Sequence, residues 1–156
     1  TKRPDRMVKV LGILFTEDTL EEADNVWFGV SAENQAEADR RIPVLLRLPV
    51  PNRWVSVEPM LGPVDLQPYL VYAACPDPGI KWVVCGCESG PGARPMETDW
   101  ARALAAQCLG EGTSFMLKQM MEDGHKVSAP YLDGRQYMGM PSFFTLRPES
   151  KCSFLE

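Results

Sequence analysis

KWVVCGCESGPGAR, residues 81–94, is the stretch that decides the fold of this chain. Its opening residues are apolar or small, as in a buried strand, and a glutamate, a serine and a turn rich in glycine and proline follow at once. Two earlier segments repeat this plan, NVWFGVSAEN at residues 25–34 and NRWVSVEP at residues 52–59. Each has a tryptophan near its start, continues with small or β-branched residues and reaches a glutamate. The repeat predicts equivalent strands whose glutamates share one functional edge.

Helical patterns alternate with these strands. In chain order, we predict a helix at 2–11, a strand at about 26–30, a helix at 33–48, a strand at about 53–57, a proline-rich loop at 62–79 with a helical turn near 66–72, a strand at 81–87, a helix from 98 or 99 to 108, and a strand at 114–118. Pro43 lies inside the second helical pattern, so we expect a break or kink there. Residues 120–156 form an irregular carboxyl-terminal extension of a single α/β domain, residues 1–156, and Asp133 with Gly134 predicts a small hairpin in it.

Alternating strands and helices at this spacing predict parallel βα units with right-handed crossovers. Such units build either an open doubly wound sheet or part of a βα barrel. One face of the strands would carry Trp27, Gly29, Ser31 and Glu33, then Trp54, Ser56 and Glu58, then Trp82, Val84, Gly86 and Glu88. That face becomes small and then acidic, as a barrel interior does where it opens into a site, whereas a sheet covered on both faces is apolar on both. We therefore favour a partial, half TIM-like barrel.

Composition excludes several classes of protein. The net charge of −5 and the pI near 5.0 argue against a large nucleic-acid surface. No apolar run approaches the roughly 20 residues of a membrane span. The five cysteines show no disulfide-scaffold spacing, which indicates a cytoplasmic protein, and the single histidine, His125, excludes sites that need two or three histidines within one chain.

Parallel α/β folds place their sites at the carboxyl ends of the strands. We expect Glu58, Glu88 and Lys118 to be catalytic. The predicted cofactor-binding residues are Ser31, Glu33, Asn34, Ser56, Ser89, Gly90, Arg94 and Gln119. Converging carboxylates raise one another's pKa unless a cation lies among them, and Lys118, Arg94, a bound amine or a divalent metal would supply it. The alternative is that each glutamate only begins the helix that follows it.

Three further features have a structural and a functional interpretation. The turn at Gly90 either only reverses the chain or lets backbone amides approach an anion. Cys85 and Cys87 share a strand face, where buried thiols are the favoured interpretation over metal binding or disulfide exchange. The tryptophans near the strand starts are expected to fill the amino end of a barrel core, with base stacking as the alternative.

Several segments together resemble a family of uncharacterised proteins from bacteriophages, prophages and bacteria. They are TKRPDRM, NVWFGVSAENQAEADRRIPVLL, RWVSVEPMLGPVDL, GCESGPGARPM and FMLKQ, within residues 1–119. Full-length members of that family look like relatives of radical S-adenosylmethionine enzymes, with a partial βα barrel and an amino-terminal cysteine cluster for a [4Fe–4S] centre. The resemblance implies that this chain corresponds to the carboxyl-terminal half of such a barrel, with its pocket facing S-adenosylmethionine and the substrate.

The chain departs from that family in its cysteines. None of Cys75, Cys85, Cys87, Cys108 and Cys152 has the spacing of a cluster ligand, and Cys85-Gly86-Cys87 stands where the family has a Gly-Gly pair before the glutamate. The resemblance therefore implies S-adenosylmethionine but no iron–sulfur ligands in this chain. We expect a homodimer, or a missing amino-terminal half or partner chain, to cover strand 26–30, because an open half-barrel has unpaired strand edges.

Two functions of other classes are alternatives to the binding of a small molecule in this pocket. One is a Mg²⁺-assisted hydrolase or phosphoryl-transfer enzyme that uses the glutamates as oxygen ligands. The other is a non-catalytic phage accessory protein that acts through protein contacts.

Overall fold

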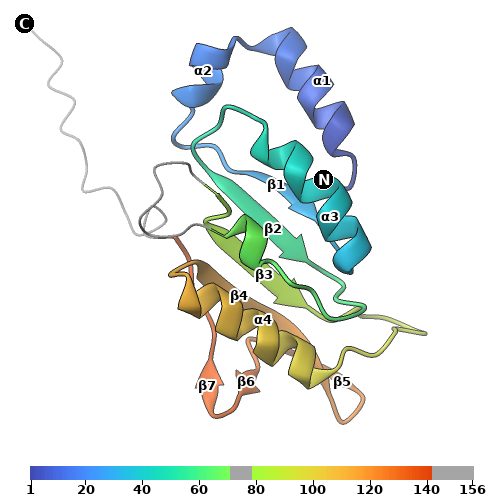
Figure 1. Ribbon diagram of the computed structural model, residues 1–156. Coiled ribbons are helices and arrows are strands. Elements are labelled where there is room, and N and C mark those ends of the chain that lie inside the picture. The colour runs from blue at the N-terminus through green and yellow to red at the C-terminus, as the bar shows by residue number, and fades with distance from the viewer. Residues whose placement is uncertain (71–78, 142–156) are drawn as a thin grey trace, which may run out of the picture.

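The computed structural model describes residues 1–70 and 79–141. Within these ranges the main sheet has the order β1-β2-β3-β4-β5, so each strand lies beside the next one in the sequence (Figure 1). The strands are β1 (Phe28–Ser31), β2 (Arg53–Val57), β3 (Trp82–Gly86), β4 (Ser114–Glu122) and β5 (His125–Ser128). The first four run parallel and β5 is antiparallel to β4. The predicted mixed α/β fold with parallel βα units is confirmed.

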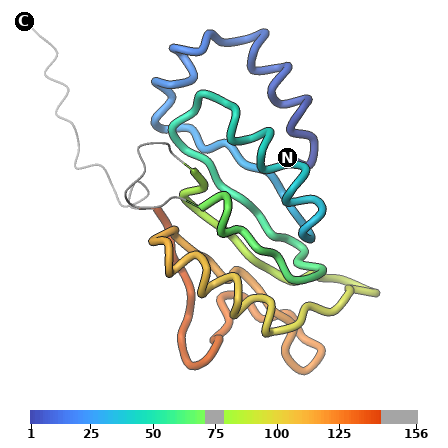
Figure 2. The backbone as a smooth tube through the Cα atoms, viewed as in Figure 1, coloured from blue at the N-terminus to red at the C-terminus, as the bar shows by residue number. Residues whose placement is uncertain are grey.

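The helices that connect the strands cover one face of the sheet, and two further helices precede β1 (Figures 1 and 2). In chain order, the helices are α1 (Pro4–Leu14), α2 (Glu17–Glu21), α3 (Gln35–Leu46), the 3₁₀ turn η1 (Gln67–Tyr69) and α4 (Thr98–Gly110). Parallel neighbours joined in sequence order by right-handed crossovers place their helices on the same side, which explains why α3 and α4 lie together. None of the helices in the described part of the chain is long and apolar enough to cross a membrane.

The core lies between the sheet and these helices. Val55 and Val83 are paired neighbours on the covered face and are fully buried, as are Ile42 and Leu45 of α3 and Leu104 of α4. Burying a side chain of this size contributes roughly 1.5–3 kcal/mol, so this layer supplies most of the stability that positions the strand ends. The alternation predicted from the sequence, apolar on one face and small or polar on the other, is confirmed.

The tryptophans gather on the other face. The ring centroids of Trp54 and Trp82 are 5.4 Å apart, and Trp27 meets Trp82 edge-on at 6.2 Å. The indole of Trp54 lies over Gly29, where a Cβ atom would overlap it. The three rings are partly buried and pack against one another at the amino end of this face.

Two details correct the predicted elements. The break expected at Pro43 is wrong: α3 runs unbroken through it, because fully buried Ile42 and Leu45 hold the helix on both sides of the proline. The strand predicted to end at residue 118 continues to Glu122. An Asp123–Gly124 turn with positive φ then leads into β5, which the sequence argument missed.

The small hairpin is confirmed. Strand β6 (Tyr131–Leu132) pairs with β7 (Arg135–Gln136), and Asp133 and Gly134 both have the positive φ of a tight hairpin turn. The helical turn predicted near 66–72 is present as η1. Residues 71 and 72 of that predicted turn, and residues 142–156 of the predicted extension, lie outside the described residues.

Candidate functional site at the carboxyl ends of the strands

Strand register gathers the predicted residues at one edge of the sheet. Ser31 of β1 pairs with Ser56 of β2, and Gly86 of β3 pairs with Gln119 of β4. Glu33, Glu58 and Glu88 follow the first three strands within two residues of their ends. We call this edge the glutamate rim. It consists of Ser31, Glu33, Ser56, Glu58, Gly86, Glu88, Lys118 and Gln119.

Glu58 lies across the surface of the sheet instead of starting a helix. Its Oε1 atom is 3.2 Å from Nζ of Lys118, and its Oε2 atom accepts a hydrogen bond of 3.1 Å from Oγ of Ser56. The carboxylate lies over Gly86, where a Cβ atom would come within 2.7 Å of Oε1. The side chain of Glu58 is 18% exposed and that of Lys118 is 56% exposed. Gly86 therefore provides the space that lets Glu58 lie beside β3.

A β-bulge brings Lys118 to this position. The pairing of β3 with β4 shifts between Cys85, opposite Leu117, and Gly86, opposite Gln119, so Lys118 is the extra residue. A bulge redirects the side chain of the residue that it inserts. The side-chain amide of Gln119 donates a hydrogen bond of 2.8 Å to the carbonyl of Cys87, which fixes the strand end behind the glutamate.

Glu33 is held by a buried arginine. Nη1 of Arg41 donates to Oε2 of Glu33 at 2.7 Å and to the carbonyl of Ser31 at 2.6 Å. Lys2 forms a second ion pair with Glu33. Burial raises the pKa of Glu33, but the hydrogen bonds from Lys2 and Arg41 outweigh that effect, and the net pKa is lowered. This glutamate joins α3 to the end of β1 and stays ionised.

Glu88 closes a turn with Arg94. Its carboxylate accepts hydrogen bonds from Nη2, Nε and the backbone N–H of Arg94 at 2.6, 2.9 and 2.8 Å. These bonds lower the pKa of Glu88 to about 2. Ser89 and Gly90 are exposed within this turn, and the φ of +107° at Gly90 explains the glycine. The contacts favour the structural interpretation of the turn.

Asn34 also has a structural role, because its side-chain oxygen accepts a hydrogen bond of 3.0 Å from the backbone N–H of Glu37 and caps α3. Ser31 takes part through its backbone carbonyl, which Arg41 binds, and its side chain lies on the tryptophan-bearing face. Lys118 and Arg94, two of the cations proposed to offset the rim's charge, each contact one glutamate. Among residues 1–70 and 79–141, no three His, Cys, Asp or Glu side chains are grouped to hold a metal ion.

Three of the cysteines belong to the core. Cys85, Cys87 and Cys108 are free and buried. Burial raises the pKa of all three thiols, that of Cys108 to about 12, and Sγ of Cys85 lies 3.6 Å from Sδ of Met60. The interpretation as small buried side chains is the one their surroundings favour; Cys75 and Cys152 lie outside the described residues.

Sequence reasoning missed Lys2 and Arg41, two residues that bind the rim residue Glu33. Arg41 had a recognisable signal, because it falls on the apolar stripe of α3 with Ala38, Ile42 and Leu45. An arginine on such a stripe needs a buried partner. No comparable pattern marks Lys2, which approaches the rim only because α1 begins beside β1. The ammonium group of Thr1 donates to the carbonyl of Gly29 at 2.8 Å.

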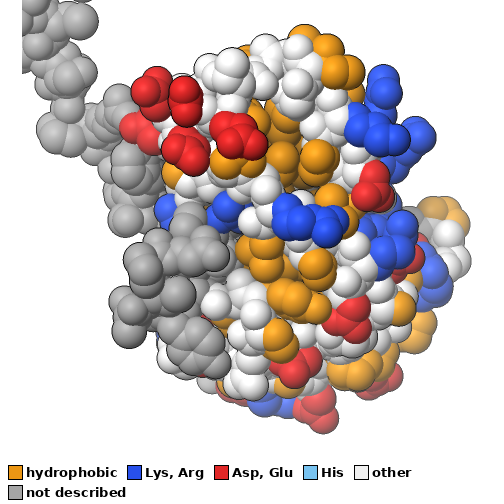
Figure 3. Space-filling view, turned by 45° about the horizontal axis from the view of Figure 1, so that its top comes forward, with side chains coloured by type: hydrophobic (Ala, Val, Ile, Leu, Met, Phe, Trp, Pro, Cys, Tyr) orange, Lys and Arg blue, Asp and Glu red, His pale blue; other side chains and the backbone are white. Residues whose placement is uncertain are grey.

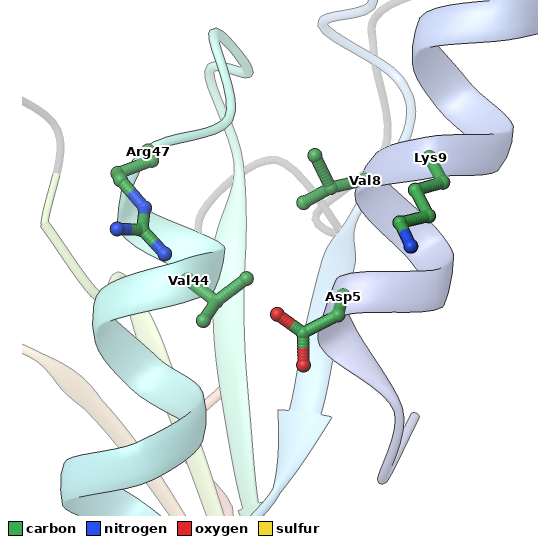
Figure 4. Close-up of a pocket in the computed structure, with 5 residues that line it drawn as sticks. All are labelled: Asp5, Val8, Lys9, Val44 and Arg47. Atoms are coloured by element: carbon green, nitrogen blue, oxygen red, sulfur yellow. The ribbon is translucent and has the colours of Figure 1, made fainter.

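A separate groove of about 190 Å³ lies between α1 and α3. Its lining residues are Asp5, Val8, Lys9, Val44 and Arg47 (Figure 4). None of the rim residues lines this groove. Its two valines face each other between charged groups of both signs, and we do not assign it the function of the rim.

The comparisons with known proteins give a family and no function. No curated protein and no solved structure matches this chain. The family described as "Protein of unknown function (DUF5131)" matches residues 1–141, which is most of the sequence. The chain belongs to the DUF5131 family.

Proposed function

We propose that this domain binds a small zwitterionic molecule at the glutamate rim, with Glu58 and Lys118 as the recognition pair. Glu58 would accept the ammonium group of the ligand, and Lys118 would bind its carboxylate. The observation that carries the proposal is the position of Glu58: its carboxylate lies over Gly86, beside an exposed ammonium group, at the carboxyl ends of the parallel strands. Sites in parallel α/β folds form at this end because the loops there vary while the strands hold them in place.

The three glutamates differ in the free energy needed to break their ion pairs, and the pair of Glu58 is the easiest to replace. A partly exposed pair such as Glu58–Lys118 contributes only about 0–1 kcal/mol, so the charges of a ligand can replace it at little cost. Arg41 is only 7% exposed, and removing the charge of Glu33 from this mostly buried guanidinium costs more, about 1–3 kcal/mol. Glu88 is occupied by the main chain as well as the side chain of Arg94. Glu33 and Glu88 therefore support the rim, and Glu58 is the group able to exchange partners.

S-adenosylmethionine is the first ligand to test, because the sequence resemblance implies it. Its methionine end carries an ammonium and a carboxylate on one carbon, and the adjacent carboxylate and ammonium of Glu58 and Lys118 fit that pair of charges. When bound, this cofactor supplies a sulfonium centre. The residues of this chain would orient the amino-acid end: Ser56 holds one oxygen of Glu58, and Gln119 fixes the strand end beside it.

An iron–sulfur centre does not fit the described residues. Cys85 and Cys108 belong to the hydrophobic core, Cys87 is also buried, and all three thiols have raised pKa values, whereas cluster ligands must be thiolates. We therefore assign no step to such a centre. In keeping with the resemblance, we propose that the sheet is part of a partial barrel whose interior is the tryptophan-bearing face. The sequential strand order and the one-sided helices support this proposal.

Titration calorimetry with S-adenosylmethionine tests the proposal. We expect binding that Glu58→Gln and Lys118→Met each weaken at least about tenfold, which corresponds to about 1.4 kcal/mol. Free methionine should compete, and 5′-methylthioadenosine, which lacks the amino-acid end, should not. Glu122→Gln, on the exposed end of β4, is the matched control and should leave affinity unchanged. Absence of binding by both S-adenosylmethionine and methionine, or binding that neither rim variant weakens, would contradict the proposal.

A further inference from the structure

An apolar surface is exposed where α1 ends. Ile13, Leu14 and Phe15 are consecutive and are 79%, 64% and 46% exposed, and Val26, after α2, is 41% exposed. Single exposed apolar residues are ordinary, but a contiguous group of large ones marks interaction surfaces. This group lies toward the amino end of β1, away from the glutamate rim (Figure 1).

An acidic surface borders these residues. Helix α2 carries Glu17, Asp18 and Glu21, and Glu22 caps its end. The sequence contains no lysine or arginine from residue 10 to residue 39. Figure 3 shows acidic side chains gathered over α2, with apolar side chains exposed beside them. None of these four carboxylates forms an ion pair within the described part of the chain.

The fold maintains this acidic surface at a cost. Glu17 with Glu21 and Asp18 with Glu22 are like-charge pairs at i,i+4 spacing, each destabilising by about 0.2–0.5 kcal/mol. Helix α2 persists because Leu20 is buried and the Thr16 hydroxyl accepts a hydrogen bond from the N–H of Thr19. A basic partner would remove the repulsion, and no residue of ranges 1–70 and 79–141 forms an ion pair that does so.

We propose that this corner of α1 and α2 is a docking surface for a basic amphipathic helix of a partner protein. The corner consists of Ile13, Leu14, Phe15, Glu17, Asp18, Glu21, Glu22 and Val26. The partner's apolar residues would pack on the exposed side chains at the end of α1, and its lysines or arginines would pair with the carboxylates of α2. This role goes beyond the binding of a small molecule at the rim.

Charge and packing favour a basic helix of another protein over nucleic acid, an anionic membrane or a second copy of the chain. An acidic surface repels nucleic acid and anionic membranes. Among the described helices of a second copy, the basic segment is the first half of α1, but its apolar residues Met7, Val8 and Leu11 pack against the core of their own molecule. A basic helix from another protein satisfies both the carboxylates and the apolar side chains.

Fluorescence anisotropy with a synthetic helical peptide tests the docking surface. The probe is a labelled peptide of leucine and lysine of about 18 residues, or five helical turns, with leucines on one face. The control peptide replaces every lysine by glutamate. We expect the lysine peptide to bind and the glutamate peptide not to bind. The double variants Ile13→Ser/Leu14→Ser and Glu17→Gln/Glu21→Gln should each weaken binding at least tenfold, and the second should also flatten its salt dependence.

Leu109→Ser is the matched control, because Leu109 is 46% exposed on α4, outside the corner. It should leave peptide affinity unchanged. All substituted side chains are exposed, so melting temperatures report whether the variants stay folded. Failure of the lysine peptide to bind, or equal binding by the corner variants and Leu109→Ser, would overturn the proposal. Self-association in sedimentation, or flotation with neutral phosphatidylcholine vesicles, that Ile13→Ser/Leu14→Ser abolishes would identify a second copy or a membrane as the occupant instead.

Discussion

Two glycines on the tryptophan-bearing face each leave space for a different neighbouring side chain. Gly29 lies beneath the indole of Trp54, and Gly86 lies beneath the carboxylate of Glu58. Trp54 belongs to β2 and Glu58 directly follows it, so this segment places one large ring over Gly29 and one charged group over Gly86. The glycines were visible in the sequence as small residues on this face, but the side chain that each accommodates depends on strand register.

Alanine at these two positions should therefore have different effects. Gly29→Ala displaces a bulky ring that also packs on Trp82, and we expect it to lower the free energy of unfolding by about 1–3 kcal/mol and to shift tryptophan fluorescence. Gly86→Ala meets the end of the flexible Glu58 side chain at 2.7 Å and Cγ of Gln119 at 3.2 Å, and both side chains can shift. It should lower stability by less than about 1 kcal/mol but weaken binding at the rim at least tenfold.

Urea denaturation followed by fluorescence measures the first effect and calorimetry the second. Gly62→Ala is the control, because no atom lies within 4 Å of a Cβ built there. Equal destabilisation by all three alanines would show that the two glycines do not accommodate Trp54 and Glu58.

At the scale of elements, Arg41 joins α3 to β1. Its guanidinium binds the carbonyl of Ser31 and the carboxylates of Glu33 and Glu37. The apolar pattern predicted α3 and its buried side chains, but Pro43 misled the prediction of its shape, because local backbone preference lost to the packing of Ile42 and Leu45. The β4–β5 hairpin was missed for a related reason: Met120 and Met121 do not mark a strand by themselves, and the Asp123–Gly124 turn was the available signal.

Glu33→Gln should reveal the energy of this junction through its dependence on pH. At pH 7 we expect the variant to be less stable by about 1–3 kcal/mol, since a mostly buried guanidinium loses a charged partner. The pKa of Glu33 in the folded protein is lowered from 4.5, so its contribution is complete above that value and is lost as the pH falls through the lowered pKa. The difference between variant and wild type should therefore shrink below about pH 4.5.

Equilibrium unfolding from pH 7 to pH 2.5 provides the measurement, and Glu122→Gln, on the exposed end of β4, should show no such difference. A Glu33→Gln deficit that stays constant across this range would mean that the glutamate acts through packing instead of charge.

At the scale of the whole molecule, the repeat of strand and glutamate was enough to predict parallel strands, a covered apolar face and a shared acidic edge. The sequence could not predict how tightly each glutamate is held, because most of the cations that bind the glutamates come from other elements of the fold. Lys2 and Arg41 bind Glu33, Arg94 encloses Glu88, and a bulge turns Lys118 toward Glu58. The DUF5131 family has no known function, so the ligand binding proposed for the rim is argued from these contacts.

The central claim is that Glu58, alone among the three rim glutamates, exchanges its partner for a ligand. Carbon-13 NMR of side-chain carboxyl groups measures this directly, with each glutamate assigned by its glutamine variant. On titration with S-adenosylmethionine, the Glu58 carboxyl resonance should shift and saturate while those of Glu33 and Glu88 stay in place. An unmoved Glu58 resonance, or equal shifts at all three carboxyls, would contradict the account.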